Sequence, residues 1–110
     1  MISSEERQRL KEITLARNEV YQGLIRDHEQ LKKQIKDHYE YEADLRGGLR
    51  LLRSCYTNKE YRTIPRIREI RRRSITLIKE TSKKRINLLY DLMSISSRLE
   101  MIHDFYDDCM

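Results

Sequence analysis

Three features of the 110-residue sequence predict an all-α protein, folded as a long antiparallel helical hairpin of the coiled-coil kind. Charged residues make up 37% and hydrophobic residues 38% of the chain, with one Pro, three Gly and no Trp. Such a composition is typical of long helices rather than of compact α/β or all-β domains. Apolar residues recur at spacings of three, four or seven over two long stretches. Gly47-Gly48 and Pro65 lie between those stretches.

The first helix is expected from about residue 4 to residue 46. The segment Ser3-Ser4-Glu5-Glu6 has the pattern of a capping box, in which Ser3 caps the helix and Glu6 reaches back to it. No Pro interrupts the helix, and the single Gly23 inside it is tolerated. Its predicted apolar stripe is Leu10, Ile13, Arg17, Val20, Leu24, Leu31, Ile35, Tyr39 and Leu45.

Gly47-Gly48 is expected to end that helix and to form a corner, because glycine readily adopts the conformations that terminate helices. The connector, residues 47–63, is predicted to contain one or two short helical turns. A second capping box, Thr57-Asn58-Lys59-Glu60, would start one of them.

The last helix is expected from about residue 64 to residue 106, with Pro65 in its first turn. Its predicted apolar stripe is Ile67, Ile70, Ser74, Leu77 or Ile78, Thr81, Leu88, Leu92, Ile95, Leu99, Ile102 and Tyr106. Each helix would bury only such a stripe, which leaves apolar edges in water. The sequence therefore predicts a single helical domain over residues 1–110 that assembles through these seams into a dimeric bundle.

The charges are unevenly distributed along the chain. Residues 59–85 contain eleven Lys or Arg and three Glu, a net charge of +8, whereas residues 1–58 carry +1 and residues 86–110 carry −4. Most of the basic side chains of the last helix lie opposite its apolar stripe or flank it. The predicted binding residues are Arg62, Arg66, Arg68, Arg72, Arg73, Lys79, Lys83 and Lys84.

A basic surface of this kind indicates a polyanion or an acidic protein as the partner. We therefore expect a small binding protein that contacts the phosphates of a DNA or RNA duplex, without sequence specificity because no side-chain set is dedicated to bases. The alternative is a coiled-coil adaptor or assembly subunit that binds an acidic protein through the same arginines. Asp37, Glu40, Glu42 and Asp44 of the first helix would face the basic block and could neutralise it.

Other classes of function find little support in the sequence. No glycine-rich phosphate loop or serine nucleophile motif occurs, so neither enzyme activity nor a cofactor is expected. Glu100 and His103 have the spacing of a di-iron ligand pair but lie at the edge of the stripe, and no metal is expected. Cys55 and Cys109 are far apart in sequence, which favours a reducing compartment. Without a membrane span or signal peptide, the chain is expected to be soluble and intracellular, cytoplasmic or nuclear.

Overall fold

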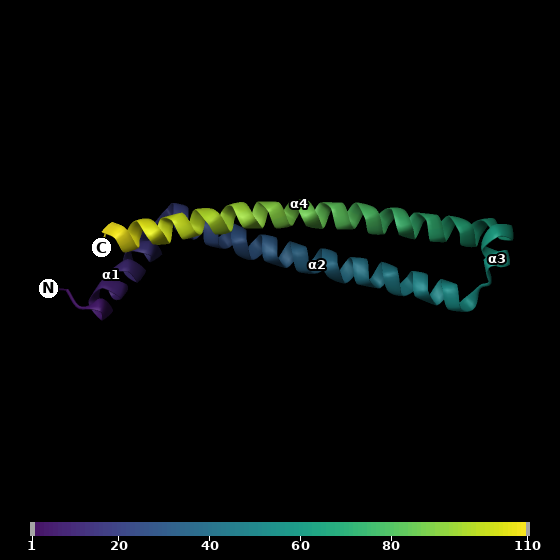
Figure 1. The fold of residues 1–110 in the computed structure, drawn as a ribbon, viewed down its shortest axis with the longest axis horizontal. Helices are drawn as coiled ribbons and strands as arrows, with labels where there is room; N and C mark the ends of the chain where they lie inside the picture. Colours follow the sequence, from purple (N-terminus) through teal and green to yellow (C-terminus); the bar gives the residue numbers. More distant parts are fainter. Residues whose placement is uncertain (1, 110) are drawn as a thin grey trace. The chain divides into compact units, whose positions relative to one another are not determined.

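The computed structural model describes residues 2–109, and side chains of residues 2–108. Over that range the chain is almost entirely helical and contains no strand, which confirms the all-α prediction. Four helices follow one another: α1 (Ser4–Arg17), α2 (Glu19–Cys55), α3 (Asn58–Thr63) and α4 (Pro65–Cys109), as labelled in Figure 1. No helix in the described range is long and apolar enough to cross a membrane.

The chain divides into two compact units, which are described separately. Unit 1 combines the residues up to Lys33 with those from Leu89 onward, and unit 2 is Gln34–Leu88. Unit 2 contains fifteen Lys or Arg against seven Asp or Glu, a net charge of +8. Unit 1 contains eight against eleven, a net charge of −3. The excess positive charge therefore belongs to unit 2.

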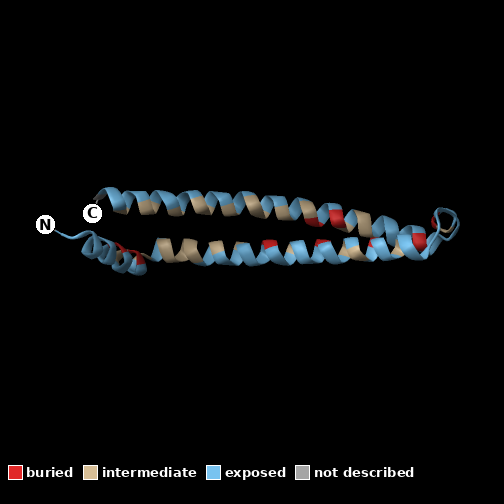
Figure 2. Ribbon diagram, turned by 60° about the horizontal axis from the view of Figure 1, so that its bottom comes forward, coloured by how far each residue is buried: buried red, intermediate tan, exposed pale blue. Residues whose placement is uncertain are grey.

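Unit 2 is a helical hairpin, as predicted. Residues 34–55 of α2 and residues 65–88 of α4 run in opposite directions and are joined through α3 (Figure 1). On α2, the buried residues Ile35, Glu42 and Leu49 are seven positions apart, the repeat of a coiled-coil seam. Ile67, Ile78 and Thr81 are buried on α4. Figure 2 shows the buried positions of these segments on the sides where the two helices face each other.

The predicted corner at Gly47-Gly48 is wrong, because α2 continues through both glycines to Cys55. Neither glycine has a positive φ angle. Continuation of the helix buries Leu49 and half-buries Leu52 in the seam. Burial of a leucine side chain contributes about 1.5–3 kcal/mol, whereas a glycine inside a helix costs about 1 kcal/mol relative to alanine. Packing therefore outweighs the glycines, and the connector begins nine residues later than predicted, at Tyr56.

The other local predictions for this connector are confirmed. The backbone N–H of Glu60 donates to Thr57 Oγ1 at 3.3 Å, and Glu60 Oε1 accepts from the backbone N–H of Thr57 at 2.9 Å, so the capping box of α3 is complete. Pro65 is the first residue of α4. Tyr61 of α3 is buried, and the guanidinium of Arg71 on α4 lies 5.4 Å from the centre of its ring.

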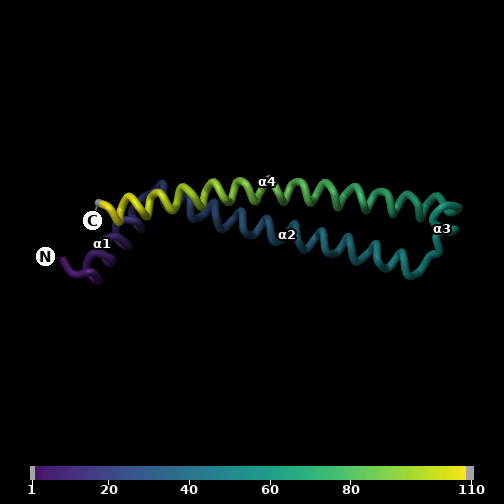
Figure 3. Tube along the Cα trace, viewed as in Figure 1, coloured from purple at the N-terminus to yellow at the C-terminus, as the bar shows by residue number. Residues whose placement is uncertain are grey.

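In unit 1, the first predicted helix is broken at Asn18, where the prediction of one continuous helix is wrong. Asn18 has an extended backbone, with φ −81° and ψ 109°, and its N–H donates to Leu15 O at 3.1 Å. Its Oδ1 accepts from the N–H of Tyr21 at 3.0 Å, so one residue ends α1 and caps α2. Figure 3 shows the trace changing direction between these helices. At the other end of α1 the predicted cap is confirmed, since Ser3 Oγ accepts from the N–H of Glu6 at 3.2 Å, but within the described residues the Glu6 side chain does not reach back to Ser3 as the capping box predicts.

The break changes which side chains of the first stretch are buried. Lys11 and Leu15 are buried, whereas four positions of the predicted stripe are exposed, namely Leu10, Ile13, Arg17 and Val20. Farther along, in unit 2, the predicted seam residue Tyr39 is 50% exposed. The predicted stripe consists of apolar residues except for Arg17, whereas the seam of α2 also contains the polar side chains of His28 in unit 1 and Glu42 in unit 2.

Polar contacts fix the antiparallel register of α2 and α4 within unit 1. Tyr21 Oη and His103 Nε2 are 3.0 Å apart, and His28 Nε2 and Ser96 Oγ are 3.2 Å apart. Each pair lies seven residues from the other on both helices, which is the step of a coiled coil. An ion pair between Lys11 and Asp107 connects α1 to α4.

The stripe predicted for the last helix lies largely on its buried side. Its residues from Leu88 to Tyr106 are all partly buried, whereas Ile70 in unit 2 is 42% exposed and does not belong to the seam. In each unit this stripe packs against α2 of the same chain. These seams are formed within the chain, and the assembly of two chains through them stays a prediction.

Candidate functional site

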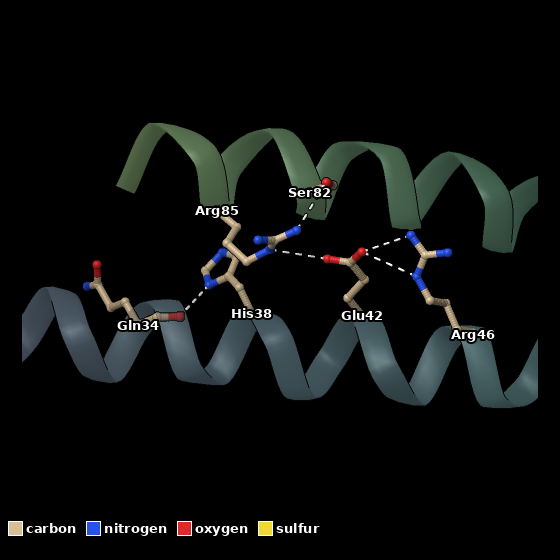
Figure 4. A network of polar contacts seen from close by, with 6 residues as sticks. All are labelled: Gln34, His38, Glu42, Arg46, Ser82 and Arg85. Atoms are coloured by element: carbon tan, nitrogen blue, oxygen red, sulfur yellow. Dashed lines mark hydrogen bonds and ion pairs between the residues drawn. The ribbon is translucent and has the colours of Figure 1, made fainter. Parts of the chain in front are cut away.

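Glu42 is the acid of α2 that reaches across unit 2 to α4. Its Oε1 accepts from Arg46 Nη2 at 3.0 Å and Nε at 3.3 Å, and its Oε2 accepts from Arg85 Nε at 3.3 Å (Figure 4). The hydrogen bond from Arg46 is the largest influence on the Glu42 carboxyl, and with the nearby charges of Arg85 and Arg46 it lowers the pKa, against the opposing effect of desolvation. The Arg85 guanidinium also stacks on the ring of Tyr39, 4.0 Å from its centre.

The remaining acids expected to face the basic block do not pair with it. Glu40 lies 4.0 Å from Lys36 on its own helix. Asp37 and Asp44 are exposed, and neither forms an ion pair within the described part of the chain. The cation that Glu42 engages on α4 is Arg85, which does not belong to the predicted binding set.

All eight predicted binding residues are exposed. Arg62 lies on α3, and the other seven lie on α4 in unit 2. None of the eight forms an ion pair with any residue whose side chain is described. Their side chains therefore carry positive charge that the rest of unit 2 does not neutralise by direct contact.

The seven residues on α4 form two rows. At about 100° per residue, one row lies opposite the seam and the other on its flank. Between the rows are the exposed acids Glu69 and Glu80. The first row spans fifteen residue steps, about 22 Å of helix. Its members are Arg68, Arg72, Lys79 and Lys83, and the flanking row is Arg66, Arg73 and Lys84.

Three further arginines on α2 were missed by the sequence analysis. Arg46, Arg50 and Arg53 recur at spacings of four and three, so they share one side of the helix, and with Leu49 they line a shallow cavity of about 240 Å³. Arg50 and Arg53 had been assigned to a connector, because the helix was expected to end at Gly47-Gly48. Recognition that the helix continues would have placed all three on one face.

Contacts across the seam show which side of unit 2 these arginines occupy. Arg46 bonds Glu42, which bonds Arg85, and Arg85 Nη2 donates to Ser82 Oγ at 3.5 Å (Figure 4). Arg68 lies fourteen residues before Ser82, which places it on the same side of α4. The α2 arginines and Arg68 therefore lie on one side of the hairpin, and both helices contribute cations to it.

Neither protein-family models, curated proteins nor solved structures show a significant match to this sequence. The function therefore has to be inferred from the surface itself. Within the described residues, no three His, Cys, Asp or Glu side chains gather as they would to hold a metal ion. Exposed positive charge on α2, α3 and α4 is the chemical property that distinguishes unit 2.

Proposed function

We propose that this chain is a small non-enzymatic binding protein whose unit 2 contacts the phosphates of a nucleic-acid duplex, DNA or RNA, without reading base sequence. The observation that supports the proposal is the exposure of eight basic side chains without acidic partners in the described structure. We call these eight residues together with Arg46, Arg50 and Arg53 the basic face.

The chemistry of the basic face suits phosphate. Eight of its eleven residues are arginines, whose planar guanidinium donates two parallel hydrogen bonds to phosphate oxygens. The row from Arg68 to Lys83 is long enough to meet several phosphates, which recur about every 3.4 Å along one strand of B-DNA. Contacts to phosphate position a protein on a duplex but carry no sequence information.

Fluorescence anisotropy of labelled duplex DNA, duplex RNA and single strands, titrated with the protein at several salt concentrations, tests the proposal. We expect micromolar or tighter binding to duplexes at low salt. Each phosphate contact adds about −0.9 to the log–log salt slope, so four contacts would weaken binding about a hundredfold between 50 and 200 mM salt. Flat curves at low salt would contradict the proposal, and the basic face would then be assigned to an acidic protein surface, the adaptor alternative.

Charge reversal at Arg68 and Arg72 tests the location of the site. Arg68→Glu combined with Arg72→Glu should weaken duplex binding at least about tenfold and reduce the salt slope by about 2, because two phosphate contacts are lost. Helicity should not change, since both side chains are exposed. The matched control is Arg9→Glu with Arg26→Glu, two exposed arginines of unit 1. Equal losses in the two variants would show that net charge, and not the basic face, determines binding.

A further inference from the structure

In unit 1, the side of α4 that faces away from the seam is unusually apolar. Four large side chains are each more than 60% exposed: Tyr90 (68%), Met93 (64%), Met101 (71%) and Phe105 (62%). At about 100° per residue they lie within an arc of roughly 120°, opposite the partly buried Leu92, Ile95 and Leu99. We call Tyr90, Met93, Ser97, Met101 and Phe105 the back face of unit 1.

The order of residues on the back face is nearly the same in both directions. Met93 and Met101 lie four residues before and after Ser97. The aromatic residues Tyr90 and Phe105 lie seven before and eight after it. When a two-fold axis at Ser97 relates two antiparallel helices, a residue a given number of positions before Ser97 faces the residue of the second copy that lies the same number of positions after Ser97. An interface of this symmetry must therefore be self-complementary. About Ser97, Met93 and Met101 exchange places, the counterpart of Tyr90 is Asp104, and Phe105 lies one residue farther on, so the methionine pair at the centre of the face meets that requirement.

The size of the back face also suits a second copy. Its four large side chains expose on the order of 100 Å² each, and paired copies would bury about 800 Å² from these residues alone. Neighbouring residues would add to this buried area and bring it toward the roughly 1,200 Å² at which stable interfaces begin. At the centre, Ser94 and Ser97 are small enough for two helices to approach closely. Asp91, Arg98 and Glu100 lie at the rim, where their charges stay in water, whereas the exposed Asp104 lies inside the arc, seven residues after Ser97.

We propose that a second copy of this chain docks on the back face, with the two α4 helices antiparallel and Ser97 at the two-fold axis. Met93 then packs against Met101 of the second copy, and Tyr90 lies opposite Asp104 and near Phe105 of the second copy. The proposal rests on unit 1 alone and does not depend on nucleic-acid binding.

Sedimentation equilibrium of the full chain and of Ser97→Glu tests this interface. The substitution places two carboxylates opposite each other at the axis, while in a single chain it changes an exposed residue to a better helix former. We expect a dimer with a micromolar dissociation constant for the native sequence, and at least a tenfold increase for Ser97→Glu with unchanged helicity. Gln30→Glu, an equal charge change at an exposed position of α2 in unit 1, should leave the dimer intact.

Disulfide formation provides a second measurement, in a background where Cys55 and Cys109 are replaced by Ser. Under oxidising conditions Ser97→Cys should cross-link to a covalent dimer, because a residue at the axis meets itself across the interface. Gln30→Cys should not. A native chain that stays monomeric at 100 µM, or a dimer that Ser97→Glu does not weaken, would overturn the proposal and leave the back face to a different occupant.

Discussion

At the scale of single residues, Glu42 determines how the polar part of the unit 2 seam is held together. It is buried with 7% of its surface exposed, and it accepts hydrogen bonds from Arg46 on its own helix and from Arg85 on α4. A carboxylate in an otherwise apolar repeat position costs desolvation, which these two arginines offset. Arg85, whose side chain is 16% exposed, is thereby removed from the set of cations available to a partner, whereas 59% of the Arg46 side chain stays exposed.

Replacement of Glu42 by Gln should lower the free energy of unfolding at pH 7 by about 1–2 kcal/mol, because the charged hydrogen bonds are lost and Arg85 remains half-buried. The value is at the lower end for such bonds, since Arg46 is largely in water. The measurement is urea denaturation followed by circular dichroism. Glu40→Gln, which changes an exposed carboxylate on the same helix, should cost less than about 0.5 kcal/mol.

The pH dependence has a defined sign. Because the pKa of Glu42 is lowered in the folded chain, its contribution to stability is present above the unfolded-state pKa of about 4.3 and is lost as the pH falls through the folded-state pKa. The stability difference between the native sequence and Glu42→Gln should therefore shrink as the pH falls below about 4.3. A difference that stays constant down to pH 2 would show that the ion pair does not provide this stability.

At the scale of helices, the sequence predicts a helix end where neighbouring residues alone determine it. It fails where contacts with distant residues determine whether the helix ends. Thr57 and Glu60 form hydrogen bonds with each other's backbone N–H within one turn, so the capping box could be predicted from the four residues 57–60 alone. Nothing in the residues around Asn18 distinguishes it from an Asn inside a helix. Its side chain donates a hydrogen bond to Tyr106, 88 positions away, and such a distant contact could not be predicted from local sequence.

The basic surface shows the same division. Exposure of the α4 cations followed from their spacing alone, because an apolar stripe predicts the opposite side of a helix. The α2 arginines are absent from the predicted set because the helix was expected to end at Gly47-Gly48, before Arg50 and Arg53. Whether acids neutralise the face was undecided from sequence, since it depends on the rotation of α2, which places Glu42 toward α4 and leaves Asp37 and Asp44 exposed.

Because α2 is a continuous helix, Gly47→Ala combined with Gly48→Ala should stabilise the chain. A Cβ added at either position meets nothing within 4 Å. Each substitution should raise the free energy of unfolding by about 0.5–1 kcal/mol, since alanine loses less backbone entropy in a helix. Thermal unfolding followed by circular dichroism measures the change. A glycine pair that acts as a corner would give the reverse, a lower melting temperature for the alanine variant.

At the scale of the whole molecule, the basic face and the back face belong to different units. Unit 2 holds a net charge of +8 and the basic face, whereas unit 1 holds a net charge of −3 and the back face. This division allows each unit to be altered without a direct effect on the other. Variants of Ser97 and variants of Arg68 should therefore separate self-association from duplex binding.

If both proposals hold, a dimer presents two basic faces, and a duplex long enough to meet both should be bound more tightly than one that meets a single face. On a duplex of about 40 base pairs, Ser97→Glu should bind about tenfold or more weakly than the native chain, because the second contact is no longer intramolecular. On a duplex of about 10 base pairs, which matches one basic face, the two proteins should bind within about twofold of each other.

Anisotropy titrations on the two lengths at one salt concentration measure this difference, and Gln30→Glu controls for the added charge. If Ser97→Glu is shown to be monomeric and binds the long duplex as tightly as the native chain, the two basic faces of a dimer do not engage one duplex. A loss of equal size on both lengths would instead place Ser97 near the nucleic acid. The length dependence, rather than the affinity itself, therefore tests whether self-association serves binding.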